Sequence, residues 1–175
     1  MRIVKNAVAE RNGSGYIKFV AQESEDMYHL YNIINTGDVI EGSTVRNVVK
    51  ETATGSVKNR MHLKVKLSVE KVEFDSEQCS LRINGRNVQE NEHIKMGQYH
   101  TIELELNQPY TLEKDLWDRL HLDCLREAAD PGRKAELLCV VVDEGLSHIC
   151  LVTSNMTITK ARIEKSFPKK NHVGA

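Results

Sequence analysis

The sequence has few aromatic residues and prolines, and it has no long hydrophobic run. Phe, Trp and Tyr make up 5% of its 175 residues, so no surface of interleaved aromatic side chains for stacking nucleic-acid bases is evident. No stretch approaches the roughly 20 apolar residues that a membrane-spanning helix needs. The opening segment Met1–Lys5 starts no apolar leader. These absences predict a cytoplasmic protein that does not enter a membrane.

Cysteine is too sparse to indicate a disulfide framework or a zinc site. The four cysteines include no Cys-x-x-Cys pair. Scattered cysteines of this kind are typical of a reducing compartment, where they pack as small apolar side chains. We therefore predict no metal and no other cofactor. The four residues are Cys79, Cys124, Cys139 and Cys150.

Neither sign of charge is in excess, and no short catalytic motif is present. Lys and Arg number 24 and Asp and Glu 25, which gives a net charge of −1. A protein with this balance is not a bulk electrostatic binder of nucleic acid, so any RNA contact must come from local basic clusters. The sequence contains no Walker loop, dinucleotide fingerprint, His-Glu-x-x-His or Gly-x-Ser-x-Gly. No motif therefore demands an enzyme.

The hydrophobic residues, 40% of the chain, follow patterns that predict a folded core. Met1–Ala9 and Tyr16–Ala21 alternate between apolar and polar residues on either side of a turn at Asn12–Gly15, which predicts a β-hairpin. A short helix is expected next, capped by Ser24 and ended by Asn35–Gly37. Its apolar stripe would consist of Met27, Leu30, Tyr31 and Ile34.

The pattern from Asp38 onward predicts mostly β-strand. Within it, the small polar residues of Glu51–Asn59 predict a long exposed hairpin loop. The alternation that starts at Leu63 changes parity after Val69. One inserted residue produces such a change, so we expect a β-bulge near Glu70–Lys71.

Further strands are expected on both sides of a polar segment. Leu81 and Ile83 indicate one strand, which the turn-forming pair Asn84–Gly85 would end, and His100–Leu106 indicates another. Short bent strands joined by turns, with one small helix near the front, predict a closed or partly closed barrel. The fold class expected is therefore mainly β with α.

A second helix is expected over Thr111–Ala129, followed by a change of pattern. Asp130–Arg133 would end the helix, whose apolar face would carry Leu116, Leu120, Cys124 and Ala128. The continuous apolar run Leu137–Val142 then indicates a central strand buried on both faces. His148–Val152 and Met156–Ser166 indicate two more strands.

Three strands of this kind cannot cover their own faces. We therefore predict one domain over residues 1–130 and the incomplete beginning of a second domain over residues 131–175.

Basic and polar residues around two segments form the candidate RNA-binding site. Lys and Arg would bind phosphates, whereas small polar and amide side chains would reach sugars and base edges. In a barrel, neighbouring hairpin loops can gather at one end, which would bring both segments together. The candidates are Arg46, Lys50, Thr54, Gly55, Ser56, Lys58, Arg60, Arg86, Asn87, Gln89 and Asn91.

A group of acids at the start of the first helix leaves a catalytic alternative open. Glu23, Glu25 and Asp26, beside His29, could hold a divalent metal in a metal-dependent endoribonuclease. The same acids also suit the positive end of a helix dipole, where they would cap the helix without any catalysis. Our prediction is that the protein is not an enzyme, with the nuclease as the alternative.

Several segments together resemble the Pelota family. Glu23–Asn32 resembles the family's Glu-Asp-Met-Trp-His-x-Tyr-Asn signature, with Tyr28 in place of the Trp. Asp38–Ser56 resembles its first long loop, and Gly85–Glu92 with Lys95–Leu104 resembles the segments that follow. Glu144–Val152 resembles the opening of the family's middle domain. The resemblance runs nearly end to end in one register.

This resemblance implies a fold and a function. The family's first domain is an Sm-like or SH3-like bent β-barrel, and a release-factor-like middle domain follows it. The resemblance implies a ribosome rescue factor that occupies the empty decoding site of stalled ribosomes, with its loops in the mRNA channel. It would promote subunit dissociation and no-go or non-stop mRNA decay. The release-factor tripeptide Gly-Gly-Gln is absent from the sequence.

The resemblance also implies partners. These are a translational GTPase of the elongation-factor family and an ATP-driven ribosome recycling protein. The family's basic loop for partner binding would correspond to Lys169 and Lys170. We expect a monomer, although exposed barrel edges could also pair into an Sm-like ring.

Overall fold

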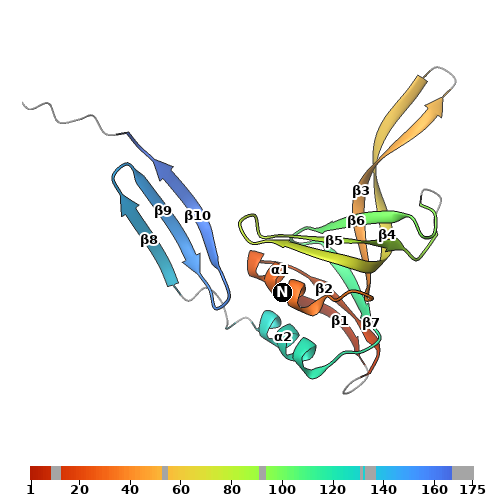
Figure 1. The fold of residues 1–175 in the computed structure, drawn as a ribbon, viewed down its shortest axis with the longest axis horizontal. Helices are drawn as coiled ribbons and strands as arrows, with labels where there is room; N and C mark the ends of the chain where they lie inside the picture. The colour runs from red at the N-terminus through yellow and green to blue at the C-terminus, as the bar shows by residue number, and fades with distance from the viewer. Residues whose placement is uncertain (9–12, 53–54, 91–93, 131, 133–136, 167–175) are drawn as a thin grey trace, which may run out of the picture. The chain divides into compact units, whose positions relative to one another are not determined.

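The computed structural model describes residues 1–8, 13–52, 55–90, 94–130, 132 and 137–166 (Figure 1). The chain divides into two compact units, which we call unit 1 (Met1–Asp130) and unit 2 (Pro131–Ala175). Neither α1 (Ser24–Ile33) nor α2 (Arg119–Ala129), the helices of the described ranges, is long and apolar enough to cross a membrane.

Unit 1 is built on one bent sheet of seven antiparallel strands (Figure 1). In sheet order the strands are β1 (Arg2–Val8), β2 (Gly15–Val20), β7 (Pro109–Lys114), β3 (Val39–Thr52), β4 (Gly55–Asp75), β5 (Ser80–Asn87) and β6 (Tyr99–Leu104). A Cβ atom placed on Gly42 of β3 would lie 3.8 Å from Ile102 of β6, although β4 and β5 separate these strands in the sheet order. The sheet therefore curls back on itself, which confirms the mainly β, bent-barrel fold class and the predicted β1–β2 hairpin.

Alternate residues of the strands form the core inside this curl. In β5 the exposure alternates residue by residue, because successive side chains of a strand point to opposite faces. Tyr110 packs in the core against Phe19, with ring centroids 6.0 Å apart, and its hydroxyl oxygen accepts from the Glu105 amide. The most deeply buried side chains include Ile17, Phe19, Ile40, Leu67, Leu81, Ile83, Ile102, Tyr110, Leu112 and Trp117.

The N-cap of helix α1 lies one residue earlier than we predicted. Its N-cap is Glu23 rather than Ser24, in a capping box with Asp26. Met27, Leu30 and Ile34 are buried as the predicted apolar stripe requires, and Ile33, outside that stripe, is buried as well. Tyr31, expected in the stripe, is instead 43% exposed and stacks on Phe74 of β4 with centroids 5.6 Å apart.

The second predicted helix was wrong over its first half. Residues 109–114 form β7, which fills the gap between β2 and β3 and completes their hydrogen bonding. Helix α2 starts only after Asp118, whose carboxylate accepts a hydrogen bond from the His121 amide as an N-cap. Leu116 and Leu120, expected on its buried face, are exposed, whereas Leu125 and Ala128 are buried. Sheet pairing thus overrode the helical spacing of the apolar residues.

The tight turn predicted at Asn84–Gly85 was also wrong. Strand β5 runs straight through both residues, with Gly85 opposite Val69 of β4. The register of the β4–β5 pair shifts between Val69 and Lys71, which confirms the predicted β-bulge. Gly85 is required there because any Cβ would lie 2.0 Å from the Ser68 carbonyl oxygen. The glycine marks a close backbone approach rather than a turn.

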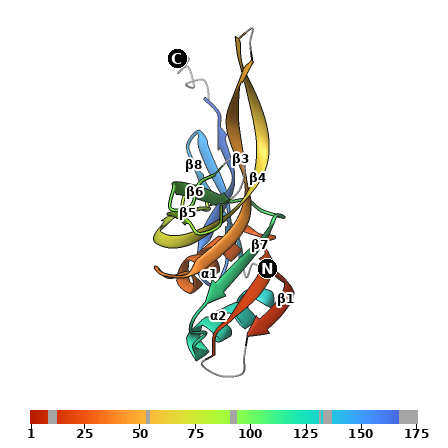
Figure 2. The same ribbon diagram turned by 90° about the vertical axis from the view of Figure 1, so that its right-hand side faces the viewer.

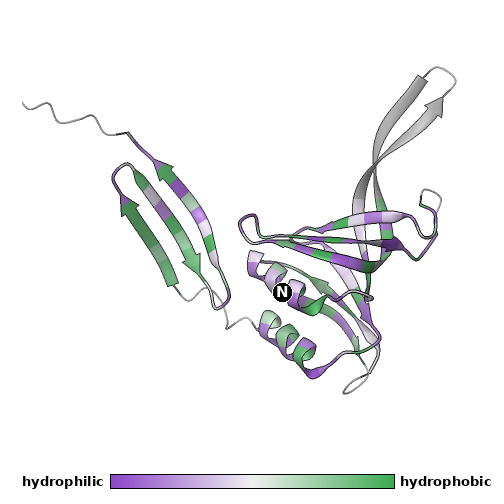
Figure 3. Ribbon diagram, in the orientation of Figure 1, coloured by the Kyte–Doolittle hydropathy of each residue, from purple (hydrophilic) through white to green (hydrophobic). Residues whose placement is uncertain are grey.

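Unit 2 holds a three-stranded antiparallel sheet in the order β10 (Thr157–Glu164), β9 (Leu146–Val152), β8 (Leu137–Asp143). The expectation of a central, doubly buried strand at Leu137–Val142 was wrong, because in the part of the chain that the structure describes β8 pairs with β9 alone and lies at the edge. Its hydrophobic residues are visible in Figure 3. Five of them are more than half exposed: Leu137, Leu138, Val140, Val141 and Val142. A run of apolar residues shows that a segment can be buried, but it does not show which other part of the chain would cover it.

We predict that a fragment ending at Asp130 folds on its own. All residues of the hydrophobic core lie between Met1 and Leu125, so the fragment keeps them all. Urea unfolding of the fragment should match unit 1 of the full chain in midpoint. A fragment ending at Lys114 should not fold, because it loses the buried Trp117 and α2. An unfolded 1–130 fragment would contradict the proposed domain boundary.

Candidate nucleic-acid interface

A two-stranded arm extends from the sheet of unit 1. Strands β3 and β4 pair continuously from Val39↔Ser68 to Thr52↔Gly55. Strand β7 pairs with β3 only as far as Glu41, and β5 pairs with β4 only from Leu67 onward. Beyond these positions, β3 and β4 pair only with each other in the described strands, as Figures 1 and 2 show. We call residues 45–62 the arm; its eight β3 residues span roughly 25 Å.

The arm replaces most of the loop predicted at Glu51–Asn59. Glu51 and Thr52 end β3, and Gly55–Asn59 belong to β4, so only residues 53–54 lie outside the described structure. Polar, small residues suggested a loop because strands usually bury one face. Here β3 and β4 continue to pair with each other beyond the positions where β7 and β5 pair with them, so this polar sequence forms a ribbon instead of a loop. Thr54 is among the residues not described.

Positive charge is concentrated in the arm. It contains four bases, Arg46, Lys50, Lys58 and Arg60, and one acid, Glu51, so its net charge is +3. Because the whole chain has a net charge of −1, the remaining residues carry −4. The arm is therefore a local basic element on an otherwise acidic chain.

The bases of β4 and β5 outside the arm are each ion-paired with a neighbouring acid. The carboxylates cancel their charge at the surface, so they add little to a phosphate-binding potential. The pairs are Lys64–Glu41, Lys66–Glu113, Lys71–Glu73, Arg82–Glu103 and Arg86–Glu70.

The register of the arm distributes its four basic positions over both faces of the ribbon. Arg46 is opposite Met61 and Lys50 is opposite Val57, whereas Arg60 and Lys58 are opposite Asn47 and Val49. Directly opposed residues share a face, and faces alternate along each strand. By register, the two basic positions of β3 and the two of β4 therefore belong to opposite faces of the ribbon.

The second predicted segment does not lie beside the tip of the arm. Arg86 is opposite Ser68, thirteen residues along β4 from Gly55, which corresponds to roughly 40 Å. The expectation that both segments gather at one end of the barrel was therefore wrong. Arg86 lies at the base of the arm, and its Nε donates to Glu70 at 2.7 Å.

Asn87 is part of the interior rather than the binding surface. It is 1% exposed, and its Nδ2 donates to the Gln89 carbonyl at 2.6 Å and to the Lys95 carbonyl at 3.2 Å. The side chain shapes the β5–β6 connection, so it cannot reach RNA in this fold. Gln89 is exposed, and Asn91 lies outside the described residues.

The acids of the nuclease alternative include one that is fully occupied by the fold. Asp26 is 5% exposed and accepts hydrogen bonds from the Met1 amine, the Gln22 amide and the Glu23 amide. These contacts close the start of α1, in agreement with the capping role. Within the described ranges, no group of three or more His, Cys, Asp or Glu side chains could hold a metal ion.

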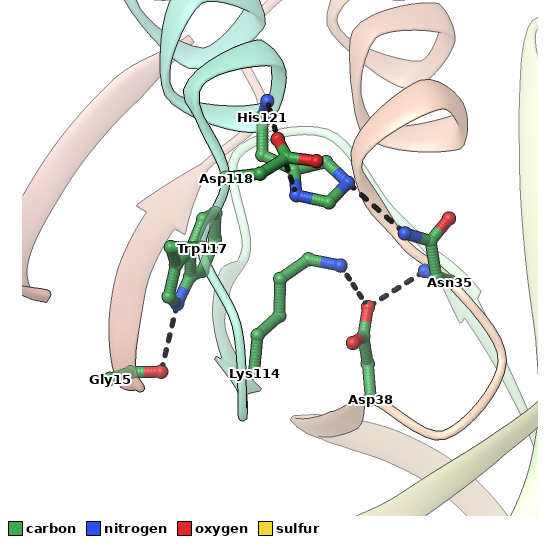
Figure 4. Close-up of polar contacts among 7 residues, drawn as sticks. All are labelled: Gly15, Asn35, Asp38, Lys114, Trp117, Asp118 and His121. Atoms are coloured by element: carbon green, nitrogen blue, oxygen red, sulfur yellow. Dashed lines mark hydrogen bonds and ion pairs between the residues drawn. The ribbon is translucent and has the colours of Figure 1, made fainter. Parts of the chain in front are cut away.

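A buried polar cluster lies at the start of β3, the strand that leads into the arm (Figure 4). Asp38 immediately precedes β3, and its carboxylate accepts from Lys114 Nζ at 2.5 Å and from the Asn35 amide at 2.7 Å. Lys114 also lies over the ring of Trp117, whose Nε1 donates to the Gly15 carbonyl at 2.9 Å. The cluster thus joins β2, β7 and the α1–β3 connection.

The sequence alone did not predict this cluster. Lys114 fell inside the predicted second helix, and Asp38 seemed to start a strand, so nothing paired them across the intervening chain. One observation could have revealed it: Lys114 continues the alternation of Tyr110 and Leu112, which places this charged residue on the buried face of β7.

Helix α2 joins the cluster through His121. Its Nε2 lies 3.0 Å from Asn35 Nδ2, and its Nδ1 lies 3.1 Å from Asp118 Oδ1 without forming a hydrogen bond. Burial, with a further contribution from the positive charge of Lys114, lowers the pKa of His121. Asp118 and Asp38 oppose this shift but do not reverse it. The neutral imidazole is therefore the form that the fold favours.

This lowered pKa predicts that unit 1 loses stability in mild acid. His121 in the unfolded chain takes up a proton near pH ~6.5, while the folded state resists protonation. The stabilisation is therefore complete above that pH and is lost as the pH falls toward the lower pKa of the folded state. Urea midpoints from about pH 8 to about pH 5 should fall less in His121→Gln, which cannot titrate. Equal pH dependence in both proteins would contradict the assignment.

Comparison with known proteins agrees with this architecture. The bent sheet of seven antiparallel strands, with its two helices, makes unit 1 a small, mainly β domain. The Pelota N-terminal domain family model matches residues 1–129, and the chain belongs to the Pelota family. The human protein pelota homolog is 46% identical over 171 residues, which cover 97% of this chain and 44% of the human protein. The chain thus spans less than half the length of the curated relatives it matches.

Solved structures of relatives show the same fold. Saccharomyces cerevisiae Dom34 matches with a TM-score of 0.60 and 26% identity over 97% of this chain and 46% of Dom34. Dom34 is a translation termination-like factor involved in RNA quality control pathways and interacts with Hbs1. Ribosome-bound archaeal Pelota, in a structure that also contains ABCE1, matches with a TM-score of 0.61 and 26% identity over 94% of this chain and 46% of that protein. The resemblance stated from the sequence is confirmed.

Proposed function

We propose that this chain is the ribosome-binding module of an mRNA surveillance and ribosome rescue factor. It occupies the empty decoding site of stalled ribosomes, extends the arm into the mRNA channel, and promotes subunit dissociation and no-go or non-stop mRNA decay. Family membership supports this role, as do the RNA quality control function of Dom34 and the ribosome-bound state of archaeal Pelota. The observation that carries the proposal is the basic arm with cationic positions on both faces.

The geometry of the arm suits an enclosed site lined by phosphates. A flat RNA surface would use the bases on one face only, whereas a channel presents phosphates to both faces of an inserted ribbon. Lys and Arg contacts to phosphates carry no sequence information. Because stalled messages differ in sequence, contacts of this kind match the task. Among the described strands, no third strand pairs with the arm.

The proposed partners follow from the relatives. We infer a translational GTPase of the elongation-factor family, supported by the interaction of Dom34 with Hbs1. We also infer an ATP-driven recycling protein, supported by the presence of ABCE1 with archaeal Pelota on the ribosome. The basic loop proposed for partner binding, at Lys169 and Lys170, lies outside the described residues. We propose no catalytic step, because the capping contacts of Asp26 give the nuclease alternative no support.

Neutralising the arm is expected to weaken ribosome binding by at least about 10-fold, because several phosphate contacts are lost together. The variant combines Arg46→Gln, Lys50→Gln, Lys58→Gln and Arg60→Gln, and binding is measured to ribosomes stalled with an empty decoding site. The salt dependence of its binding should also become shallower, since fewer counterions are released. Circular dichroism and urea unfolding confirm that unit 1 remains folded.

A charge-matched variant separates the arm from bulk electrostatics. Lys64, Lys71, Arg82 and Arg119 are exposed bases outside the arm that already pair with acids. Replacing these four by Gln changes the net charge by the same amount, but binding should stay close to that of the wild type. Equal weakening in both variants would show that only net charge matters and would refute the role of the arm.

The two faces of the arm can be tested separately. The pair Arg46→Gln and Lys50→Gln removes the bases of one face, and Lys58→Gln with Arg60→Gln removes those of the other. An enclosing channel predicts a comparable loss of affinity for both pairs. A loss confined to one pair would indicate a flat binding surface instead of a channel.

A further inference from the structure

Two cysteines of unit 2 lie directly opposite each other in neighbouring strands. The register of the β8–β9 pair places Cys139 against Cys150. Cys150 is in turn opposite Thr159 of β10, with its Sγ 3.9 Å from the Thr159 hydroxyl oxygen. The three residues therefore form one row across the same face of the sheet. Both cysteines are free thiols and partly exposed, so a small reagent can reach them.

The backbone geometry at this position permits a disulfide. Opposite residues of an antiparallel pair have Cα atoms roughly 4.5–5.5 Å apart, within the range of roughly 4.4–6.8 Å that disulfides span. Their Cβ atoms lie roughly 4.5–5.5 Å apart, slightly more than a disulfide prefers, so the strands must draw together a little. Strand β8 lies at the edge of the sheet, where such a movement disturbs one neighbour only.

The remaining cysteines have a different setting. Cys79 lies in the turn between β4 and β5, and Cys124 lies in α2, both in unit 1. Burial, with smaller contributions from nearby acids, raises the pKa of the Cys124 thiol, which leaves less of the reactive thiolate. Neither residue is opposite another cysteine in the described strand pairs.

We propose that Cys139 and Cys150 are a thiol modification site, which forms a reversible disulfide across β8 and β9 by exchange with a low-molecular-weight disulfide such as oxidised glutathione. One cysteine loses its proton, and its thiolate attacks a glutathione sulfur. This forms a mixed disulfide and releases one reduced glutathione. The second cysteine, also deprotonated, attacks the protein-bound sulfur and releases the second glutathione. Two protein thiols are oxidised and one glutathione disulfide is reduced.

The bond would tie the exposed apolar strand β8 to β9, the strand that it pairs with in the described sheet. It closes a short loop around the β8–β9 turn at Glu144–Gly145, so the stabilisation is local to unit 2. Strand β8 then separates less readily from the sheet, and its exposed leucines and valines stay paired with β9. Unit 1, with its separate core, is not affected.

Mass spectrometry of the full 175-residue chain tests the site. The chain is equilibrated in glutathione buffers from fully reduced to fully oxidised, free thiols are alkylated, and non-reducing peptide maps are recorded. We expect a loss of two hydrogens, a peptide that links Cys139 to Cys150, and alkylation of Cys79 and Cys124. Reduction should reverse the link. The variant Cys79→Ser with Cys124→Ser should give the same linked peptide.

Single substitutions identify the resolving step. In Cys139→Ser or Cys150→Ser, the remaining thiol has no partner, so a mixed disulfide with glutathione should persist there. In the wild type, three outcomes would overturn the proposal: both thiols fully alkylated even in oxidised buffer, a persistent mixed disulfide on either residue, or a link that joins two chains. The wild-type measurement decides the matter even where a variant fails to fold.

Discussion

Replacing Lys114 by methionine should destabilise unit 1 by about 3–5 kcal/mol, because Asp38 would remain buried without its partner. The side chain of Lys114 is 2% exposed and that of Asp38 is 10% exposed. The remaining Asn35 amide supplies only one hydrogen bond to the carboxylate. A small domain has a total stability of about 5–15 kcal/mol, so the variant would lie near the limit of folding. Urea unfolding at neutral pH measures the effect.

Two further variants separate the buried pair from ordinary surface pairs. Lys114→Met combined with Asp38→Leu removes both charges and should recover much of the loss, since two apolar groups can replace a buried pair. Lys66→Met breaks the ion pair between Lys66 and Glu113, whose side chains are 31% and 51% exposed. This substitution should cost less than about 1 kcal/mol. Equal costs for Lys114→Met and Lys66→Met would contradict the assigned role of the buried pair.

Replacing Gly85 by alanine should cost about 3 kcal/mol, because the added Cβ has no room beside β4. It would lie 2.0 Å from the Ser68 carbonyl oxygen and 2.9 Å from the Ser68 carbonyl carbon. Both atoms belong to the backbone at the β-bulge, so no side-chain rotation relieves the contact. The β4–β5 pair would have to move apart, and the register that defines the base of the arm would be disturbed.

Gly97 provides the matched control for this substitution. It has a φ of +76°, and a Cβ placed there has no neighbour within 4 Å. Gly97→Ala should therefore cost only about 1 kcal/mol, the strain of a left-handed backbone for alanine. Urea unfolding of both variants distinguishes the two causes. A larger loss for Gly97→Ala than for Gly85→Ala would contradict the close approach of β4 and β5.

Both predicted losses concern the base of the arm rather than the arm itself. Asp38 precedes β3, and Gly85 is opposite Val69, one residue beyond the Val39↔Ser68 pair that opens the hairpin. A hairpin without a third strand is marginally stable by itself. Its direction therefore depends on the fixed geometry at its root, which the polar cluster and the bulge provide.

The parts of the fold that depend on local patterns were predictable. The β1–β2 hairpin followed from alternation around a glycine-containing turn, and the β-bulge followed from the change of parity after Val69. The helix at Ser24–Ile33 followed from its apolar stripe, with an error of one residue in its cap. Family membership was carried by several quoted segments in one register, a signal that does not require a structure.

Other features depended on partners that the sequence does not display. The apolar residues around Tyr110 and Leu112 fit both the helical and the strand period. They form a strand because β7 pairs with β2 on one side and with β3 on the other. Asn87 seemed a polar loop residue until two carbonyls were found to enclose its amide. The polar residues of the arm suggested a loop because their pattern does not show that β3 and β4 pair with each other along their whole length.

The sequence by itself determined the secondary-structure periodicity of most strands, the family and the excess of positive charge in residues 45–62. Only the tertiary structure decided that these basic positions have registers on two faces of the ribbon, that Arg86 is far from the tip, and that Lys114 and Asp38 meet. The physical reason is that alternation and composition are local properties of the chain. Cross-strand register and buried charge pairs arise from contacts between residues far apart in the sequence.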